Sequence, residues 1–326
     1  MTQTTNSNNR WAAGLQRLAH RLHTTLNPYA SRQEEQATAV LDTPSAQDML
    51  DAIREELKTE TFAIPIFPTI AQRVLAKVND PRVEVADIAR LIESDSALAA
   101  QVLGVSNSAA FSGGTPIVTV QRAIAQLGLH RVRSLLFAVM RRNMFPRSQH
   151  RPHHQAYFHE ALATAAAAEA LGLAIKVDVG TEQRFLYGIL HNVGKPCMLN
   201  LISHMQSRHQ LPRTLDAETT QALVALTYEE CGALLAQRWK LPTDFSDVIC
   251  YHKVPEQLDA TYRNGALLTH MAIAVCSTWG IGYMRDPLNI VFNSPHAAQL
   301  GLTPADFDHA AQSTLERYTT LKDALS

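Results

Sequence analysis

The chain has 326 residues, of which 46% are hydrophobic and 18% are charged, and its formal net charge is −1. This composition predicts a soluble globular protein, long enough for one large domain or two lobes. Because the charges nearly cancel, no basic field covers the whole protein, which disfavours nucleic acid or a membrane surface as its main partner.

The polar N-terminus lacks the apolar stretch of a signal peptide. The longest uncharged stretch, residues 266–282, contains several polar side chains. We therefore expect a buried helix there and no transmembrane segment. The cysteines form no CxxC pair, which indicates reduced thiols in a cytoplasmic protein; they are Cys197, Cys231, Cys250 and Cys276.

Residues 1–45 are predicted to form an amphipathic helix followed by a linker. In residues 10–24, Trp11, Leu15 and Leu22 fall on one helical face and arginines fall elsewhere. Such a basic helix is expected to pack on its own domain or on a second copy of the chain, which would give a homo-oligomer. A membrane surface or another partner is the alternative.

Residues 46–145 predict a first lobe of short helices. Ser45 is positioned to cap a helix that runs to about Leu57. Pro65 and Pro68 set the entry of the next helix, and Gly128 separates the last two. No alternating apolar pattern long enough for a sheet is present.

Residues 146–155 contain two prolines and few apolar side chains, and are interpreted as a linker between lobes. The second lobe, 156–300, begins with an alanine-rich helix, and further helices are predicted at 181–203, 228–239, 243–251 and 264–280. A C-terminal helix (301–326) starts near Thr303 and Pro304, with Asp306 completing a capping box. The predicted fold class is all-α, in two lobes.

The segment FLYGILHNVGKPCML (185–199) resembles the motif of HD-domain metal-dependent phosphohydrolases, usually written LLHDIGK. In such sites histidines and aspartates hold one or two metal ions that activate water. The resemblance implies that His159 and His191 match the histidines, that Asn192 replaces one aspartate and that Ile273 replaces the other. With two carboxylates missing, we expect no catalysis and no cofactor.

Two alternatives stay open for these positions. The histidines are most simply buried residues with satisfied hydrogen bonds, but a residual zinc site that includes His252 or His270 is conceivable, because zinc tolerates nitrogen-only ligands. A metal-dependent phosphohydrolase that acts on a nucleotide or cyclic dinucleotide is the alternative function.

Three further blocks resemble the conserved segments of HDOD domains, which are non-catalytic relatives of the HD enzymes. They are IPIFPTIAQRVLAKVNDP, DIARLIESDSALAAQVLGVSNSAAF and IVTVQRAIAQLGLHRVRSLL, and EECGALLAQRWKLP adds a fourth in the second lobe. The resemblance extends over about residues 60–285, although Tyr228 stands where the family often has histidine. Most matching positions are expected to be structural; they include Pro65, Pro68, Gly128, Gly194, Gly232, Trp239 and Pro242.

This resemblance implies a regulatory module of bacterial signal transduction that binds proteins or ligands. The expected partners are kinases, response regulators or cyclic-dinucleotide enzymes, all acting in trans. A candidate ligand or partner groove between the lobes is predicted near Asn107, Ser108, His191 and His252, where helix-end amides would suit an anion.

Six arginines occur close together in the sequence and are interpreted as a solvated basic face; they are Arg131, Arg133, Arg141, Arg142, Arg147 and Arg151. A nucleic-acid-binding regulator is the second alternative function, and the neutral total charge makes nucleic acid an unlikely partner.

Overall fold

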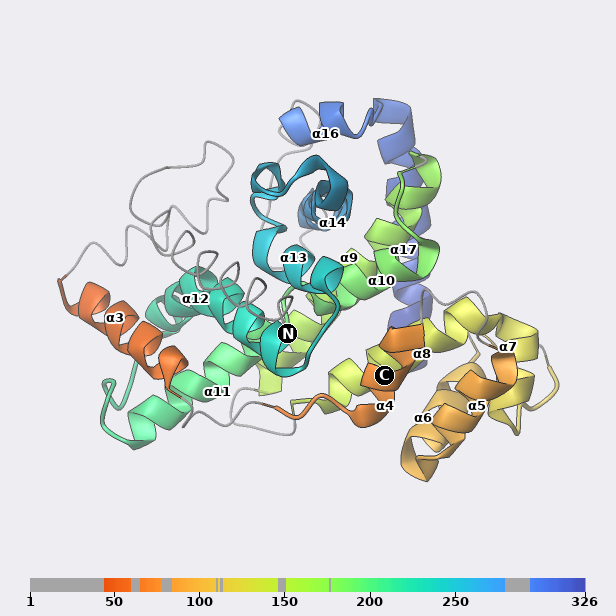
Figure 1. Cartoon of the computed structure of the whole chain (residues 1–326), viewed down its shortest axis with the longest axis horizontal. Coiled ribbons are helices and arrows are strands. Elements are labelled where there is room, and N and C mark those ends of the chain that lie inside the picture. The colour runs from red at the N-terminus through yellow and green to blue at the C-terminus, as the bar shows by residue number, and fades with distance from the viewer. Residues whose placement is uncertain are drawn as a thin grey trace, which may run out of the picture.

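In the computed structural model, the described residues form a packed assembly of helices (Figure 1). The structure describes residues 44–59, 65–77, 84–109, 111, 114–145, 151–175, 177–278 and 294–325. All regular elements within these ranges are helices, which confirms the all-α prediction. The predicted amphipathic helix at residues 10–24 lies outside the described residues.

Five short helices form the first lobe, and local signals in the sequence set their ends. The Asp95 side chain accepts a hydrogen bond from the backbone of Leu98 at the start of one helix. At the start of the following helix, the Thr119 side chain accepts from the backbone of Arg122 in the same way. Gly128 has a φ of +86°, which only glycine adopts readily, and it separates the last two helices. The helices are α4 (Thr69–Lys77), α5 (Val85–Glu93), α6 (Ser96–Ser106), α7 (Val120–Leu127) and α8 (Leu129–Asn143).

The second lobe is organised around α9 (Arg151–Ala174). On it pack α10 (Thr181–Leu190), α14 (Ala260–Thr278) and α17 (Pro304–Leu325). Alanine side chains let these helices approach closely, and Ala165, Ala166 and Ala167 are fully buried. A Cβ atom on Gly188 of α10 would lie 2.4 Å from the Ala165 Cα, so this crossing requires glycine. The other elements are α11 (Gly194–Ser207), α12 (Ala217–Arg238), α13 (Thr243–Tyr251) and η1 (Pro255–Gln257).

The C-terminal part contains α16 (Pro295–Gln299) and α17 (Pro304–Leu325). The predicted capping box is confirmed: the Asp306 backbone donates to Thr303 Oγ1 at 3.2 Å, and the Thr303 backbone donates to Asp306 Oδ2 at 3.0 Å. Helix α17 runs along α9, where Arg317 pairs with Glu169 at 3.2 Å.

Two predicted boundaries are wrong. Helix α3 (Pro44–Lys58) packs on α12, where Arg54 Nε donates to Glu230 Oε1 at 3.1 Å, so it belongs with the second lobe and not the first. Figure 1 shows α3 beside α12, at the opposite side of the molecule from α5 to α7. Helix α9 begins at Arg151, so residues 151–155 are helical, since the first turn of a helix tolerates Pro152.

The two lobes share one hydrophobic core. The Trp239 ring stacks on Phe67 with ring centroids 4.8 Å apart, and its indole nitrogen donates to the Pro65 carbonyl at 2.8 Å. This pairing fastens the entry of α4 to the end of α12. Within the described residues, no helix is both long and apolar enough to cross a membrane.

Candidate functional site: a buried polar cluster at the HN motif

His191 lies in the turn between α10 and α11 and is 1% exposed. Its Nδ1 atom is 2.7 Å from the Gly188 carbonyl oxygen. Because a carbonyl only accepts, we assign the proton to Nδ1, which leaves a lone pair on Nε2. That Nε2 atom is buried and has no hydrogen-bond partner among the described residues. Burial lowers the pKa of His191 to about 4, so the ring is neutral at neutral pH.

Asn192 joins the two lobes through its side-chain amide. Its Oδ1 atom accepts a hydrogen bond from Arg141 of α8 at 3.3 Å, and its Nδ2 atom donates to the Tyr157 carbonyl of α9 at 3.1 Å. An aspartate at this position would lack the donor that reaches Tyr157. The asparagine at this position therefore has a structural use of its own.

Glu160, which the sequence reasoning missed, is the acidic side chain that contacts the motif. The Lys195 ammonium donates to Glu160 Oε1 at 2.7 Å, and both side chains are largely buried. Burial acts to raise the pKa of Glu160, but the charge and hydrogen bond of Lys195, together with His191, outweigh it and hold the pKa below its usual value. The only sequence signal was its place one residue after His159.

His252 completes this group from the end of α13. Its Nδ1 atom lies 3.0 Å from the Val248 carbonyl, so Nε2 is left to accept from the Tyr228 hydroxyl at 2.9 Å. Its ring stands nearly perpendicular to that of His191, with centroids 5.2 Å apart. Burial and the neighbouring His191 push the pKa of His252 well below its ordinary value. We call the following residues the HN cluster: Arg141, Glu160, His191, Asn192, Lys195 and His252.

His159 does not join the HN cluster. It is half-buried, its Nδ1 atom lies 3.4 Å from the Tyr318 hydroxyl of α17, and the two rings meet edge to face. Successive side chains on a helix are rotated by about 100°, so Glu160 points toward the motif when His159 points toward α17. The resemblance matched both His159 and His191 to metal-binding histidines, but His159 contacts α17 and His191 contacts Gly188 of α10. Ile273 is partly buried on α14.

Of the four residues predicted to line a groove, which are Asn107, Ser108, His191 and His252, the two histidines are buried and do not reach the surface. The Asn107 side chain is instead committed to the loop after α6. It accepts from the Ile117 backbone nitrogen and donates to the Ile117 carbonyl, both at 2.7 Å. Asn107 thus holds the loop closed in the manner of a backbone pair.

Most of the positions predicted to be structural lie at turns or close contacts. A Cβ atom on Gly194 would lie 1.9 Å from the Tyr228 carbonyl oxygen and 2.9 Å from the Gly232 nitrogen, so α11 and α12 touch there. Pro242 precedes α13. Pro65 and Trp239 meet as described above, and Pro68 directly precedes α4.

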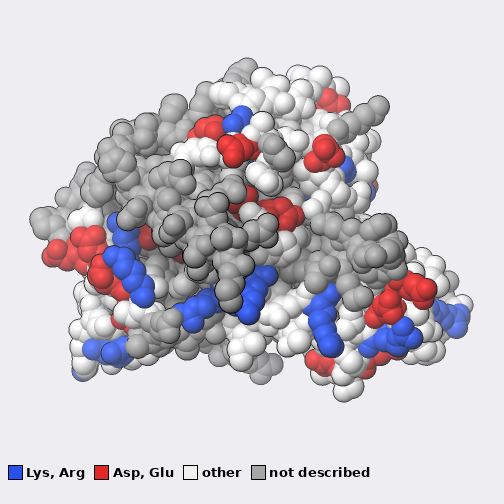
Figure 2. Space-filling model, in the orientation of Figure 1, with Lys and Arg blue, Asp and Glu red and all other residues white. Residues whose placement is uncertain are grey.

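The predicted basic face is wrong for two of its arginines. Arg133 and Arg141 are buried, at 5% and 3% exposure, whereas Arg131 is exposed with its guanidinium over the Phe111 ring. Charges of both signs are interspersed over the face shown in Figure 2. Arg147 and the side chain of Arg151 lie outside the described residues.

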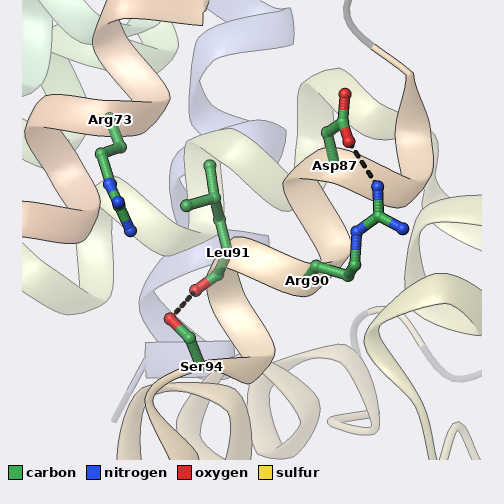
Figure 3. A pocket seen from close by; sticks show the side chains of 5 residues that line it. All are labelled: Arg73, Asp87, Arg90, Leu91 and Ser94. Atoms are coloured by element: carbon green, nitrogen blue, oxygen red, sulfur yellow. Dashed lines mark hydrogen bonds and ion pairs between the residues drawn. The ribbon is translucent and has the colours of Figure 1, made fainter.

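A cavity of about 350 Å³ opens between α4 and α5 (Figure 3). Three of its polar side chains already have partners: Arg90 donates to Asp87 at 2.6 Å, and the Ser94 hydroxyl donates to the Leu91 carbonyl at 2.6 Å. Arg73 lines the opposite wall and is exposed. The cavity therefore offers a ligand little beyond one solvated cation.

The HN cluster does not fit the metal ion of the HD enzymes. Among the described residues, no three His, Cys, Asp or Glu side chains lie where they could hold a metal together. Within the part of the chain that the structure describes, His191 Nε2 and Glu160 Oε2 are buried and have no hydrogen-bond partner, but Glu160 Oε1 accepts a hydrogen bond from the Lys195 ammonium. The amide of Asn192 is bonded on both sides.

Comparison with known proteins connects this arrangement to a family. An uncharacterized protein of Treponema pallidum (strain Nichols) is 28% identical over 204 residues, which cover 58% of this chain and 37% of that protein. The chain therefore matches well under half the length of that curated relative.

Solved structures share the fold at low sequence identity. An HDOD domain protein of Geobacter sulfurreducens superposes with a TM-score of 0.65 at 20% identity, over 85% of this chain and 98% of that one. A Shewanella amazonensis SB2B protein named as a metal-dependent phosphohydrolase gives 0.65 at 18% identity, over 87% and 100%. A Marinobacter aquaeolei VT8 protein named for signal transduction gives 0.64 at 20% identity, over 86% and 66%.

The HDOD domain profile matches residues 64–255, which is more than half of the chain and includes both the first lobe and the HN motif. The chain belongs to the HDOD domain family.

Proposed function

We propose that this protein is a non-catalytic regulatory module that acts in signal transduction by binding protein partners in trans. The observation that carries the proposal is the double hydrogen bond of Asn192 to Arg141 and Tyr157. The position at which HD enzymes use a metal-binding aspartate is here a link between lobes. A relative of the same fold named for signal transduction supports the regulatory role.

The burial of the HN cluster supports the same proposal. His191 and Asn192 are 1% and 0% exposed, and His252 is fully buried. A hydrolase needs open positions on its metal for substrate and water, but these side chains make contacts within the protein. Kinases, response regulators and cyclic-dinucleotide enzymes remain the expected classes of partner, and a second copy of the chain is a further one.

The experiment is affinity capture of full-length protein from native lysate, followed by reconstitution of each captured complex from purified components. We expect at least one signalling protein to bind wild type directly with a defined stoichiometry. A folded full-length protein that forms no direct, stoichiometric complex with any of them would count against the proposal.

The alternative, a metal-dependent phosphohydrolase, is supported by the name of one structural relative. A phosphodiesterase screen with Mn²⁺ and with nucleotide and cyclic-dinucleotide substrates tests it. Turnover that His191→Ala abolishes and that the exposed control His309→Ala retains would establish the hydrolase instead. A nucleic-acid-binding regulator would instead show affinity that falls steeply as salt is added.

A further inference from the structure

Ile66 is the most exposed large hydrophobic side chain in the part of the chain that the structure describes. It is 88% exposed, whereas its neighbour Phe67 is 3% exposed. The prolines on either side, Pro65 and Pro68, restrict the backbone of this short segment. The Phe67 ring stacks on Trp239, and the Pro65 carbonyl accepts a hydrogen bond from the Trp239 indole. The segment is therefore held on both sides of Ile66, and the isoleucine is presented to solvent in a fixed place.

Lys240, which follows Trp239 in the chain, has a backbone conformation that costs free energy. Its φ is +52°, in the left-handed region where a Cβ atom crowds the backbone. Its backbone nitrogen donates to the Gln237 carbonyl at 3.1 Å, and the Leu241 nitrogen donates to the Ala236 carbonyl at 3.0 Å. Glycine is the usual residue at this place in such a helix end. The Lys240 side chain is exposed, so packing does not explain why a lysine is here.

The two segments that meet at Trp239 carry only positive charges. Residues 65–77 and residues 231–243 contain no aspartate and no glutamate, although the net charge of the whole chain is −1. Arg73, Arg238 and Lys240 lie in these segments and are exposed. A single exposed isoleucine is common on protein surfaces, but Ile66 adjoins a local excess of cations. An apolar side chain beside cations complements an acidic segment that also carries an apolar residue.

We propose that Ile66 and Lys240 are the centre of a docking surface for an acidic segment of a protein partner. The docking surface consists of Ile66, Arg73, Arg238 and Lys240. An apolar side chain of the partner covers Ile66, and carboxylates of the partner pair with Lys240 and the two arginines. The inference rests on the proposed function, because it names the surface through which this module binds a partner.

Binding accounts for the strain at Lys240 and for the exposure of Ile66. Strained backbone at a surface position is kept where it serves a use, and here the use is to aim a cation. The contact of Trp239 with Phe67 and Pro65 already fixes both parts of the docking surface in the free protein. Little conformational freedom is therefore lost when the partner binds.

The probe is a random peptide library displayed on phage and selected on full-length wild-type protein. Synthetic copies of the enriched peptides are then titrated by calorimetry. We expect these peptides to combine Asp or Glu with an apolar residue. Ile66→Asp and Lys240→Glu should each weaken their binding by about tenfold or more. The matched controls Val118→Asp and Lys322→Glu, at exposed positions outside the docking surface, should leave the affinity unchanged.

Lys240→Gly separates the use of the lysine from its strain. We expect this variant to unfold at a higher urea concentration than wild type, because glycine adopts a positive φ without strain, and yet to bind the peptides more weakly. His209, with a φ of +60°, holds the same place at the end of α11, where the Gln210 nitrogen donates to the Met205 carbonyl at 2.9 Å. His209→Gly should also raise the unfolding midpoint but keep the affinity of wild type.

Several results would overturn the docking surface, with each variant first shown to be folded by circular dichroism. They are a selection that enriches no peptide, enriched peptides without acidic residues, and peptides that bind wild type, Ile66→Asp and Lys240→Glu equally. Sedimentation of wild type tests another occupant: a dimer that Ile66→Asp dissociates would show that the surface binds a second copy of the chain instead.

Failure of the docking surface and failure of the proposed function give different results. A reconstituted partner that binds wild type, Ile66→Asp and Lys240→Glu with equal affinity would overturn the docking surface and leave the regulatory role intact. Peptides whose binding depends on both residues, in the absence of any direct protein complex, would support the docking surface and count against the proposed function.

Discussion

Acidification is expected to destabilise the fold through His191, whose pKa is about 4 in the folded protein and about 6.5 in the unfolded chain. The group is neutral in both states above pH 7, so it costs nothing there. Below about pH 6.5, His191 is protonated in the unfolded chain but stays neutral in the folded protein. The free energy of unfolding therefore falls as the pH is lowered toward 4. His252, whose pKa is also depressed, acts in the same direction.

The size of the effect follows from the two pKa values. The full difference corresponds to about 3 kcal/mol, and by pH 5 about 2 kcal/mol of it is expressed. This is a large part of the total stability of an ordinary domain, which is about 5–15 kcal/mol. The contribution of His191 is therefore measurable above the general effect of acid on carboxylates.

The assay is urea unfolding of wild type and His191→Gln at pH 7.5, 6.0 and 5.0, with exposed His309→Gln as control. We expect His191→Gln to be less stable than wild type at pH 7.5, because it disturbs the contact with Gly188, but to lose about 2 kcal/mol less on going to pH 5. The control should follow the wild-type slope. Parallel pH slopes for wild type and His191→Gln would refute the assignment of a buried neutral imidazole.

Three further predictions concern stability and are measured by chemical unfolding. Gly194→Ala should lower the free energy of unfolding by about 3 kcal/mol or more, because the new methyl group would meet the backbone of α12. Gly104→Ala is the control: a Cβ there has nothing within 4 Å, so this change should stabilise α6 by about 0.5–1 kcal/mol. Equal effects of the two changes would contradict the close crossing. Asn107→Ala should cost about 1–3 kcal/mol, since it leaves backbone groups of the following loop unpaired; a neutral result would show that water replaces the amide. Trp239→Phe keeps an aromatic ring but loses the bond to the Pro65 carbonyl, so we expect a loss of about 1–2 kcal/mol; no loss would mean that stacking alone fastens α4.

The helices and several of their ends could be predicted from the sequence because their signals are local. Asp95 and Thr303 accept hydrogen bonds from backbone nitrogens three residues later, and Gly128 adopts a backbone conformation that other residues avoid. Family blocks in order and at regular spacing identified the HDOD resemblance, which the profile match over residues 64–255 confirms.

Which side of each helix faces which neighbour could not be predicted from the sequence, because tertiary packing decides it. His159 and Glu160 are neighbours on α9, but successive side chains on a helix point in different directions. His159 therefore contacts Tyr318, whereas Glu160 contacts Lys195. The register of a helix relative to its neighbours is set by packing of the whole surface, and an alanine-rich helix that is buried along most of its length gives no polar face to mark it.

The position of α3 on α12 and the burial of Arg141 have the same origin. Both depend on contacts between residues far apart in the chain, such as Arg54 with Glu230 and Arg141 with Asn192. The sequence by itself therefore determined the fold class and the family. Only the packed structure decided that Glu160 is the carboxylate at the motif and that a lysine lies beside it, because long-range packing leaves no local pattern in the chain.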